Sequence, residues 1–372
     1  MMSSKERSSA DCISVEYEGK FSYYIYLRQD FLDLKEELIR LECEGRRICI
    51  VTDSNVGPLY EEALKSAIAG VASKITVFTF KAGEEQKNLS TVEQLYEHLI
   101  LESFDRKDVL IALGGGVVGD LTGFTAATYL RGIRFIQVPT SLLAMVDSSI
   151  GGKTGVDFKS YKNMVGAFYM PKCVYMNLSC LLTLDDRQFY AGFGEIIKHG
   201  LIKDKNYYEW LKQHREAILH KDFNSLKETV YRSCMIKRDV VQRDPKEKGE
   251  RALLNFGHTL GHAVEKQMLF EKLHGECVSI GMAAASFLSF KRGDITREEY
   301  EDIKTVLKVY SLPVTVKNCN KEEILSAASH DKKMDGKKIK FILLKQIGEA
   351  VIDTTVSQEE MKHALDSLEE TE

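Results

Sequence analysis

The sequence of 372 residues predicts an α/β protein in two parts, a parallel-sheet domain over residues 1–184 and a mainly α-helical domain over residues 185–372. Three observations predict this fold class. Short apolar runs alternate with helical periods in the first half of the chain, which is typical of a parallel sheet covered by helices. A glycine-rich turn directly follows one of those runs. Beyond residue 184, helical periodicity dominates the chain.

The expected elements follow this division. In the first half, we expect strands at residues 23–27, 47–52, 74–80, 108–113 and 134–138. Helices are expected at residues 60–69 and 91–101, with one more between the last two strands. In the second half, helices are expected at residues 206–220, 225–241, 259–268, 277–291, 297–309 and 321–330. A late strand pair is expected at residues 340–344 and 349–353.

Bulk composition narrows the class of protein. Hydrophobic residues make up 44% of the chain, which is enough for a sizeable core and argues against a disordered protein. The formal net charge is −4, so we expect no nucleic-acid partner, although a local basic pocket is compatible with this value. The eight cysteines contain no C-x-x-C pair and are expected to be reduced thiols.

The same residues predict a soluble cytoplasmic protein without a membrane partner. No apolar run approaches the ~18 residues that a membrane-spanning helix needs. The opening ten residues are polar and lack the apolar core of a secretory signal, so we expect a short tail there.

Glycine is concentrated in one part of the chain, since 13 of the 26 glycines fall between Gly114 and Gly200. Gly114, Gly116 and Gly119 form a G-x-G-x-x-G pattern between an expected strand and an expected helix. Such a turn lets backbone N–H groups meet a pyrophosphate at a helix N-terminus. No acidic residue lies about 20 positions later, where a Rossmann fold places its ribose ligand. A tight turn without a ligand is the alternative, and Asp53 could bind a ribose or cap a helix.

A second glycine-rich stretch runs from Asp147 to Thr154 and places Lys153 after two glycines. It lacks the first glycine of a Walker A loop. A lysine in this setting suits a phosphate or carboxylate, and a solvated loop lysine is the alternative.

Histidines give the sharpest chemical pattern. His258 and His262 stand at positions i and i+4, His274 follows, and Glu195 is expected to open another helix. Two imidazoles and one carboxylate with an open position form the ligand set of a catalytic zinc. Spacing does not decide which two histidines bind, and a structural histidine pair is the alternative. The cations Lys198, Lys237 and Arg251, with Lys153, would suit a small molecule that carries several negative charges.

Several motifs, in order, closely resemble those of the 3-dehydroquinate synthases in the sugar-phosphate cyclase superfamily. They are GGGVVGDLTGF at 114–124, RGIRFIQVPT at 131–140, AMVDSSIGGKTG at 144–155, KNMVGAF at 162–168, GEIIKHG at 194–200, RALLNFGHTLGH at 251–262 and HGE at 274–276. The match covers residues 53–281 and continues weakly to the segment Asp331-Lys-Lys.

This resemblance implies a Rossmann-like NAD-binding domain, followed by a metal- and substrate-binding domain, in a homodimer. It implies that Glu195, His258 and His274 bind one divalent ion, zinc or cobalt, and that His262 instead transfers protons or supports the ligands. The implied reaction, in the shikimate pathway of aromatic amino acid biosynthesis, converts 3-deoxy-D-arabino-heptulosonate 7-phosphate into 3-dehydroquinate and phosphate. The implied enzyme is a carbon–oxygen lyase. It works by transient oxidation with NAD, phosphate elimination, re-reduction and an intramolecular aldol closure.

The resemblance also assigns roles to individual residues. The implied catalytic residues are Lys153, Lys198, Lys237, Arg251, Asn255 and His262. The implied substrate contacts are Asp147, Lys153, Asn163, Glu195, Lys237, Arg251, Asn255 and His262, with Arg131 and Lys332 or Lys333, of which Arg131 would reach the phosphate from the partner subunit. The implied NAD contacts are Asp53, Asn55, Glu84, Lys87, Gly115, Gly116, Val117, Asp120, Thr140, Ser141, Lys153, Lys162 and Thr183.

Departures from the family pattern are few. Ser141 stands where threonine is usual and keeps the hydroxyl, and the segment Asp157-Phe-Lys-Ser-Tyr replaces the commoner Asn-His-Pro-Leu-Gly. The main alternative is an aminodehydroquinate synthase or another secondary-metabolism cyclase, such as one that makes deoxy-scyllo-inosose or a valiolone. A metal-dependent polyol dehydrogenase, which would release NADH, and a binding protein without activity belong to other classes.

Overall fold

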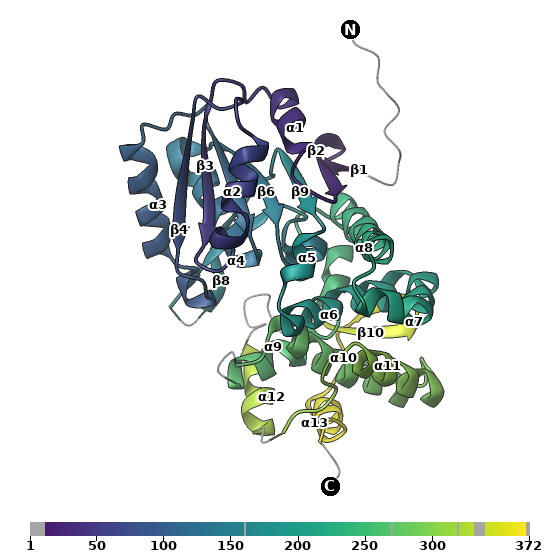
Figure 1. Cartoon of the computed structure of the whole chain (residues 1–372). Coiled ribbons are helices and arrows are strands. Elements are labelled where there is room, and N and C mark those ends of the chain that lie inside the picture. The colour runs from purple at the N-terminus through teal and green to yellow at the C-terminus, as the bar shows by residue number, and fades with distance from the viewer. Residues whose placement is uncertain (1–11, 160, 269–270, 318–319, 331–338, 370–372) are drawn as a thin grey trace. The chain divides into compact units, whose positions relative to one another are not determined.

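The computed structural model describes residues 12–159, 161–268, 271–317, 320–330 and 339–369. The chain divides into two compact units, Met1–Leu184 and Asp185–Glu372. Figure 1 shows the first unit as strands flanked by helices and the second as a group of helices with a short strand pair. The α/β fold class predicted from the sequence is confirmed.

The first unit is built on a seven-stranded sheet in the order β1-β2-β9-β6-β5-β3-β4. All neighbouring strands are parallel except β1 and β2. The strands are β1 (Cys12–Tyr17), β2 (Lys20–Arg28), β3 (Arg47–Asp53), β4 (Lys74–Phe80), β5 (Val109–Gly114), β6 (Arg134–Pro139) and β9 (Cys173–Asn177). Every residue of β5 is buried, as expected for a parallel strand that is covered on both faces.

Helices and one hairpin complete this unit. The helices are α1 (Leu34–Arg40), α2 (Gly57–Ala67), α3 (Leu89–Leu101), α4 (Gly116–Thr128) and α5 (Cys180–Thr183). The antiparallel hairpin consists of β7 (Lys153–Phe158) and β8 (Tyr161–Phe168). The five strands and the helices expected in this half are confirmed, although β1, β9 and the hairpin were not expected. The run CVYMN of β9 is short and wholly buried, so it shows no alternation of apolar and polar residues.

The second unit is mainly helical. Its helices are α6 (Asp186–Lys203), α7 (Lys205–Leu219), α8 (Phe223–Arg243), α9 (His258–Gln267), α10 (His274–Lys291), α11 (Arg297–Val309), α12 (Lys321–His330) and α13 (Gln358–Asp366). The antiparallel strands are β10 (Phe341–Gln346) and β11 (Glu349–Asp353), as expected. A 3₁₀ segment, Glu250–Asn255, precedes α9.

One expectation for this unit is wrong. Glu195 was expected to open a helix, but it lies in the middle of α6. The helix begins earlier because the Asp185 side chain accepts hydrogen bonds from the backbone N–H groups of Arg187 and Gln188. Gly194, directly before Glu195, is inside the helix, where the absence of a side chain leaves room for Gly275.

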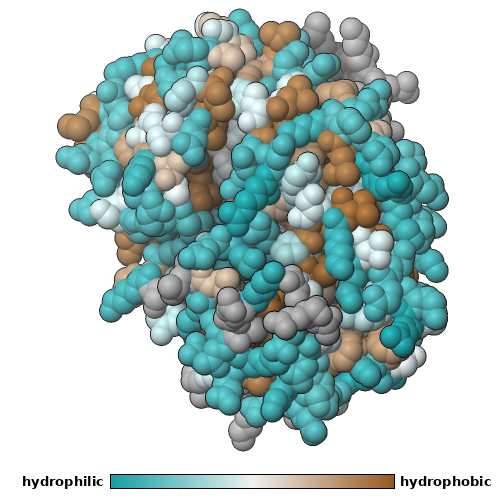
Figure 2. All heavy atoms as spheres, turned by 60° about the horizontal axis from the view of Figure 1, so that its bottom comes forward, coloured by the Kyte–Doolittle hydropathy of each residue, from teal (hydrophilic) through white to brown (hydrophobic). Residues whose placement is uncertain are grey.

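No helix in the described part of the chain has the length and the apolar character needed to cross a bilayer. Figure 2 shows one face of the molecule, on which hydrophilic residues predominate and hydrophobic residues lie in small groups. The seven cysteines that the structure describes are free thiols, as expected.

Candidate functional site

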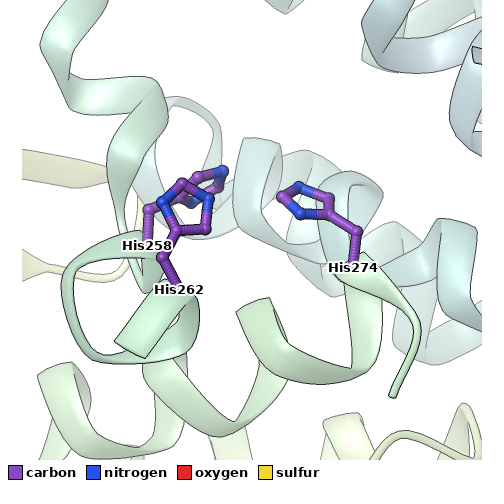
Figure 3. Close-up of side chains that lie close together, drawn as sticks. All are labelled: His258, His262 and His274. Atoms are coloured by element: carbon purple, nitrogen blue, oxygen red, sulfur yellow. The ribbon is translucent and has the colours of Figure 1, made fainter. Parts of the chain in front are cut away.

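Three imidazoles converge in the second unit. His258 and His262 lie on α9, and His274 is the first residue of α10, as Figure 3 shows. The ring centroid of His258 lies 4.9 Å from that of His262 and 5.3 Å from that of His274. One ring nitrogen of each histidine lies within 4.8 Å of the others, which is close enough for a shared metal ion. The expected histidine cluster therefore exists, and α9 and α10 together build it.

Glu195 reaches the same place from α6. Its Oε1 lies 3.5 Å from Nε2 of His274 and 3.7 Å from Nε2 of His258. The approach depends on two glycines. A Cβ on Gly194 would lie 2.6 Å from the carbonyl oxygen of Gly275, and a Cβ on Gly275 would collide with the carbonyl of Ala191. The absence of both side chains lets α6 and α10 cross closely, which places Glu195 beside His274.

Two of the three imidazoles make a polar contact through Nδ1, a hydrogen-bond contact in His258 and a longer ion-pair contact in His274. Nδ1 of His258 lies 3.2 Å from the carbonyl oxygen of Phe256, and Nδ1 of His274 lies 3.9 Å from Oε2 of Glu265. In both rings the other nitrogen, Nε2, is the one that faces Glu195. Histidines that bind metals usually make this kind of contact through the nitrogen that is not bound to the ion.

The electrostatics of this cluster favour a cation. Burial alone would raise the pKa of Glu195, but the Lys198 ammonium, which forms an ion pair with Oε2, and the neighbouring His274 and His258 outweigh it and hold that pKa well below its ordinary value. Burial and then the Lys198 charge lower the pKa of His258. Burial also lowers the pKa of His274, but the carboxylates of Glu195 and Glu265 raise it to about 9. Ionised Glu195 and neutral His258 are in the forms that bind a divalent ion, whereas His274 must release a proton when an ion binds.

The other predicted residues of this unit gather against α6. Lys198 is on α6 itself, Lys237 is on α8, and Arg251 and Asn255 belong to the 3₁₀ segment, which packs with α8 onto α6. The three cationic side chains are buried, which is unusual for lysine and arginine. Arg251 donates a hydrogen bond to the carbonyl of Pro245, at 2.6 Å. Lys332 and Lys333 lie outside the described residues.

In the first unit, the predicted glycine turn stands where the strand order reverses. β3 pairs with β4 on one side and with β5 on the other, so the connection from β4 to β5 crosses β3. Ligands of such sheets bind at the carboxyl ends of the strands at this point. The register places Asp53, which ends β3, level with Gly114, which ends β5.

The helix that follows has a bare N-terminus. Gly115 precedes α4 and Gly116 and Val117 open it, and no side chain caps the first turn. Its first N–H groups therefore have no partner within the helix. Asp53 uses Oδ1 to accept hydrogen bonds from the backbone of Asn55, at 2.8 Å, and Val56, at 2.9 Å. These bonds close a turn that leads into α2, whose N-cap residue is Val56, so Asp53 is not the helix cap that the sequence left open.

Lys87 is the centre of a second cluster in this unit. Its Nζ donates to Oδ2 of Asp120 at 2.6 Å and to Oδ1 of Asn163 at 2.5 Å. Burial would lower the pKa of Lys87, but the carboxylates of Asp120 and Glu84 raise it, so the ammonium stays charged. Lys162 lies 3.6 Å from Glu84. The structure therefore brings together five residues that were predicted separately as NAD or substrate contacts.

The remaining predicted residues of this unit lie at several places along the chain. Thr140 is buried after β6, and its N–H donates to the carbonyl of Gly114 at 3.0 Å. Ser141 follows it, Asp147 belongs to the turn Ala144–Ser148, and Thr183 contacts Tyr60. Arg131 and Lys153 are exposed, at the turn after α4 and at the start of β7.

Comparison with known proteins decides the family. The model of the 3-dehydroquinate synthase N-terminal region matches residues 77–191, and that of the C-terminal region matches residues 192–334. The chain is 43% identical to the 3-dehydroquinate synthase of Acetivibrio thermocellus, over 94% of this chain and 97% of that protein. The chain belongs to the 3-dehydroquinate synthase family.

A second relative carries the same name, and solved structures share the fold. The 3-dehydroquinate synthase of Nitrosospira multiformis is 44% identical over 90% of this chain and 91% of its own length. Among solved structures, 2-epi-5-epi-valiolone synthase from Streptomyces hygroscopicus, with NAD⁺ and Zn²⁺ bound, is 29% identical. It has a TM-score of 0.87 and covers 95% of this chain and 98% of that one. A sulfoacetaldehyde reductase from Bifidobacterium kashiwanohense shares the fold, with a TM-score of 0.68 at 12% identity and coverage of 94% and 97%.

Two contacts of this 3-dehydroquinate synthase family member were missed by sequence reasoning. Glu265 lies behind His274, and Asp157 accepts a hydrogen bond from the backbone N–H of Asn163 at 2.7 Å. Asn163 has a φ of 54°, a left-handed conformation that the contact with Asp157 supports. The sequence shows only that Glu265 follows His262 by three residues and so shares its helix face; the contact with His274 and the burial of Glu265 come from the structure.

Proposed function

We propose that this chain is a 3-dehydroquinate synthase. It converts 3-deoxy-D-arabino-heptulosonate 7-phosphate into 3-dehydroquinate and phosphate as an NAD- and metal-dependent carbon–oxygen lyase. The convergence of Glu195, His258 and His274, in a chain of this family, is the observation that carries the proposal.

The residues present fit a divalent ion. Oε1 of the buried Glu195 carboxylate has no hydrogen-bond partner among the described residues, and Oε2 pairs with Lys198, which balances the charge. Two imidazole nitrogens face this carboxylate, and a nitrogen and oxygen donor set suits zinc or cobalt. Glu195, His258 and His274 would hold the ion. When bound, it would lower the pKa of a substrate hydroxyl and polarise a carbonyl.

The first unit fits a dinucleotide. The bare N-terminus of α4 lies at the carboxyl ends of the strands, where a pyrophosphate would accept hydrogen bonds from backbone N–H groups. A pyrophosphate would have to approach the backbone closely there. Space is limited at this turn, since a Cβ on Gly116 would lie 3.1 Å from Oγ of Ser148. NAD, when bound, would accept a hydride and return it. The residues proposed to hold it are Asp53, Asn55, Glu84, Lys87, Gly115, Gly116, Val117, Asp120, Thr140, Ser141, Lys153, Lys162 and Thr183.

Side chains of this protein would bind the substrate and move protons. Lys153, Lys237 and Arg251 would bind the carboxylate and phosphate of the substrate, because charge-assisted bonds to such groups are strong. Lys198 keeps Glu195 ionised. His262, which lies beside the proposed ligands, would move protons. Asp147, Asn163 and Asn255 would hold substrate hydroxyls.

Assembly and location belong to the same proposal. We propose a cytoplasmic homodimer, in which Arg131 reaches the phosphate bound by the partner subunit. Its exposed position on the turn Tyr129–Arg131 supports this role.

A coupled assay tests the proposal. Purified protein with NAD, Zn²⁺ or Co²⁺ and the heptulosonate phosphate is expected to release phosphate while NADH absorbance stays near baseline. Glu195→Ala, prepared in parallel, is expected to release none above background. Accumulation of NADH in step with substrate loss would indicate a dehydrogenase. Turnover of an aminated substrate analogue in preference to the heptulosonate phosphate would indicate an aminodehydroquinate synthase.

A further inference from the structure

Glu265 is a buried carboxylate to which the proposed reaction gives no role. Its side chain is only 5% exposed, and it follows the buried residues Ala263 and Val264 on α9. Burying an ionised carboxylate costs free energy unless a partner compensates it. Glu265 follows His258 by seven residues and His262 by three, so it lies on the helix face that carries the histidines.

The position of Glu265 relative to His274 explains its burial. Oε2 lies 3.9 Å from Nδ1 of His274, and Nε2 on the other side of that ring lies 3.5 Å from Oε1 of Glu195. The imidazole therefore stands between two carboxylates, one on α9 and one on α6. The distance of 3.9 Å between Oε2 of Glu265 and Nδ1 of His274 is about 1 Å longer than a typical N–H···O hydrogen bond. A small rotation of either side chain would bring the two atoms within hydrogen-bond distance.

His274 needs such support more than His258 does. Nδ1 of His258 already contacts the backbone carbonyl of Phe256, two residues earlier in the chain. The backbone of His274 is fixed, because Glu276 accepts a hydrogen bond from the N–H of Leu273 at 2.8 Å and pairs with Arg187. These contacts fix the backbone at the start of α10, but they do not fix the rotation of the His274 ring. Glu265 is placed to fix that rotation.

We propose that Glu265 is a positioning residue that accepts the Nδ1–H of His274 and thereby aims Nε2 at the metal ion bound with Glu195. This inference rests on the metal site of the proposed function. A carboxylate in this role fixes the tautomer and the ring orientation, and its loss typically costs 10- to 100-fold in metal affinity or activity.

Metal affinity of the full-length protein tests the inference. Competition with a chromogenic chelator for Zn²⁺, together with the visible spectrum of Co²⁺-loaded protein, is measured for Glu265→Ala, Glu265→Met and Glu265→Gln. We expect the Ala and Met variants to bind Zn²⁺ about 10- to 100-fold more weakly and to show an altered Co²⁺ spectrum. Met fills the space of Glu, so its loss of affinity does not come from a cavity. Gln retains an acceptor oxygen and is expected to restore affinity to within a few fold.

A matched control separates positioning from general destabilisation. Glu360 pairs with Arg292 beyond the opposite end of α10, and Glu360→Ala is expected to bind Zn²⁺ like the wild type. Wild-type affinity in both the Ala and the Met variants would overturn the inference while leaving the proposed function intact. Equal loss in the Gln variant would also overturn it. A wild-type protein that binds neither ion would overturn the proposed metal site itself, and this inference with it.

Discussion

Substituting Gly194 by alanine tests how the fold brings Glu195 to the histidines. The new Cβ would lie 2.6 Å from the carbonyl oxygen of Gly275 and 2.9 Å from its Cα. Non-bonded contacts between carbon atoms prefer about 3.5 Å or more, so α6 and α10 must separate by roughly 1 Å. Overpacking of this kind costs about 1–3 kcal/mol of the free energy of unfolding. At an ordinary helix position the same change would stabilise the protein by about 0.5–1 kcal/mol, so even the sign is informative.

The same movement carries Glu195 away from His274. Glu195 directly follows Gly194, and His274 directly precedes Gly275. Metal ligands tolerate only about 0.2 Å of displacement. We therefore expect Gly194→Ala to bind Zn²⁺ at least about tenfold more weakly than wild type. The affinity is measured by chelator competition and the stability by chemical unfolding.

A second overpacked glycine provides the control. A Cβ on Gly123, in the other unit, would lie 3.1 Å from Cβ of Thr154. Gly123→Ala is expected to lose stability and to keep its Zn²⁺ affinity. If Gly194→Ala is as stable as the wild type and binds Zn²⁺ equally well, the close crossing of α6 and α10 does not position the carboxylate and the reasoning is refuted.

Three further predictions follow from other contacts. His258→Ala is expected to lose bound metal, whereas His262→Ala keeps it and loses phosphate release; elemental analysis showing a metal-free His262→Ala protein would reverse the ligand assignment. Asp157→Ala is expected to raise KM for the substrate by about tenfold, because Asn163 loses the contact that supports its backbone, and Asp157→Asn is expected to restore KM; equal KM values in all three proteins would contradict this role. The pKa of Glu250 is lowered to about 2 by its hydrogen bond to Arg243 and, after the opposing effect of burial, by Lys203, so its contribution to stability is complete above its unfolded pKa of 4.5 and disappears as the pH falls towards about 2. Unfolding of Glu250→Gln beside wild type, at stepwise lower pH, is expected to show a difference that shrinks over that range, and a constant difference would contradict the assignment.

Much of the fold could be predicted because its signals are local. The strands β3 to β6 are apolar runs bounded by turns, and the helices of the second unit repeat their apolar residues every three to four positions. β9 could not be recognised, because five buried residues carry no periodicity. Glu195 was expected at a helix start, but it lies within α6, where the close approach of Gly275 requires a glycine at position 194, a contact that the sequence does not show.

The site shows the same limit. The histidine cluster follows from a spacing of four residues on α9 and one nearby histidine, which sequence can show. The contact between Glu265 and His274 joins two helices, and the contact between Asp157 and Asn163 depends on a left-handed residue. Neither contact has a fixed spacing along the chain. Such contacts depend on tertiary packing and were found only in the structure.

The most direct measurement of the central claim is product formation with NAD supplied well below the amount of substrate. If the hydride is returned in every cycle, 3-dehydroquinate and phosphate form in equal amounts and far exceed the NAD supplied, and no NADH remains. Product that stops at the amount of NAD supplied, with that NAD converted to NADH, would contradict the claim and indicate a net oxidation instead.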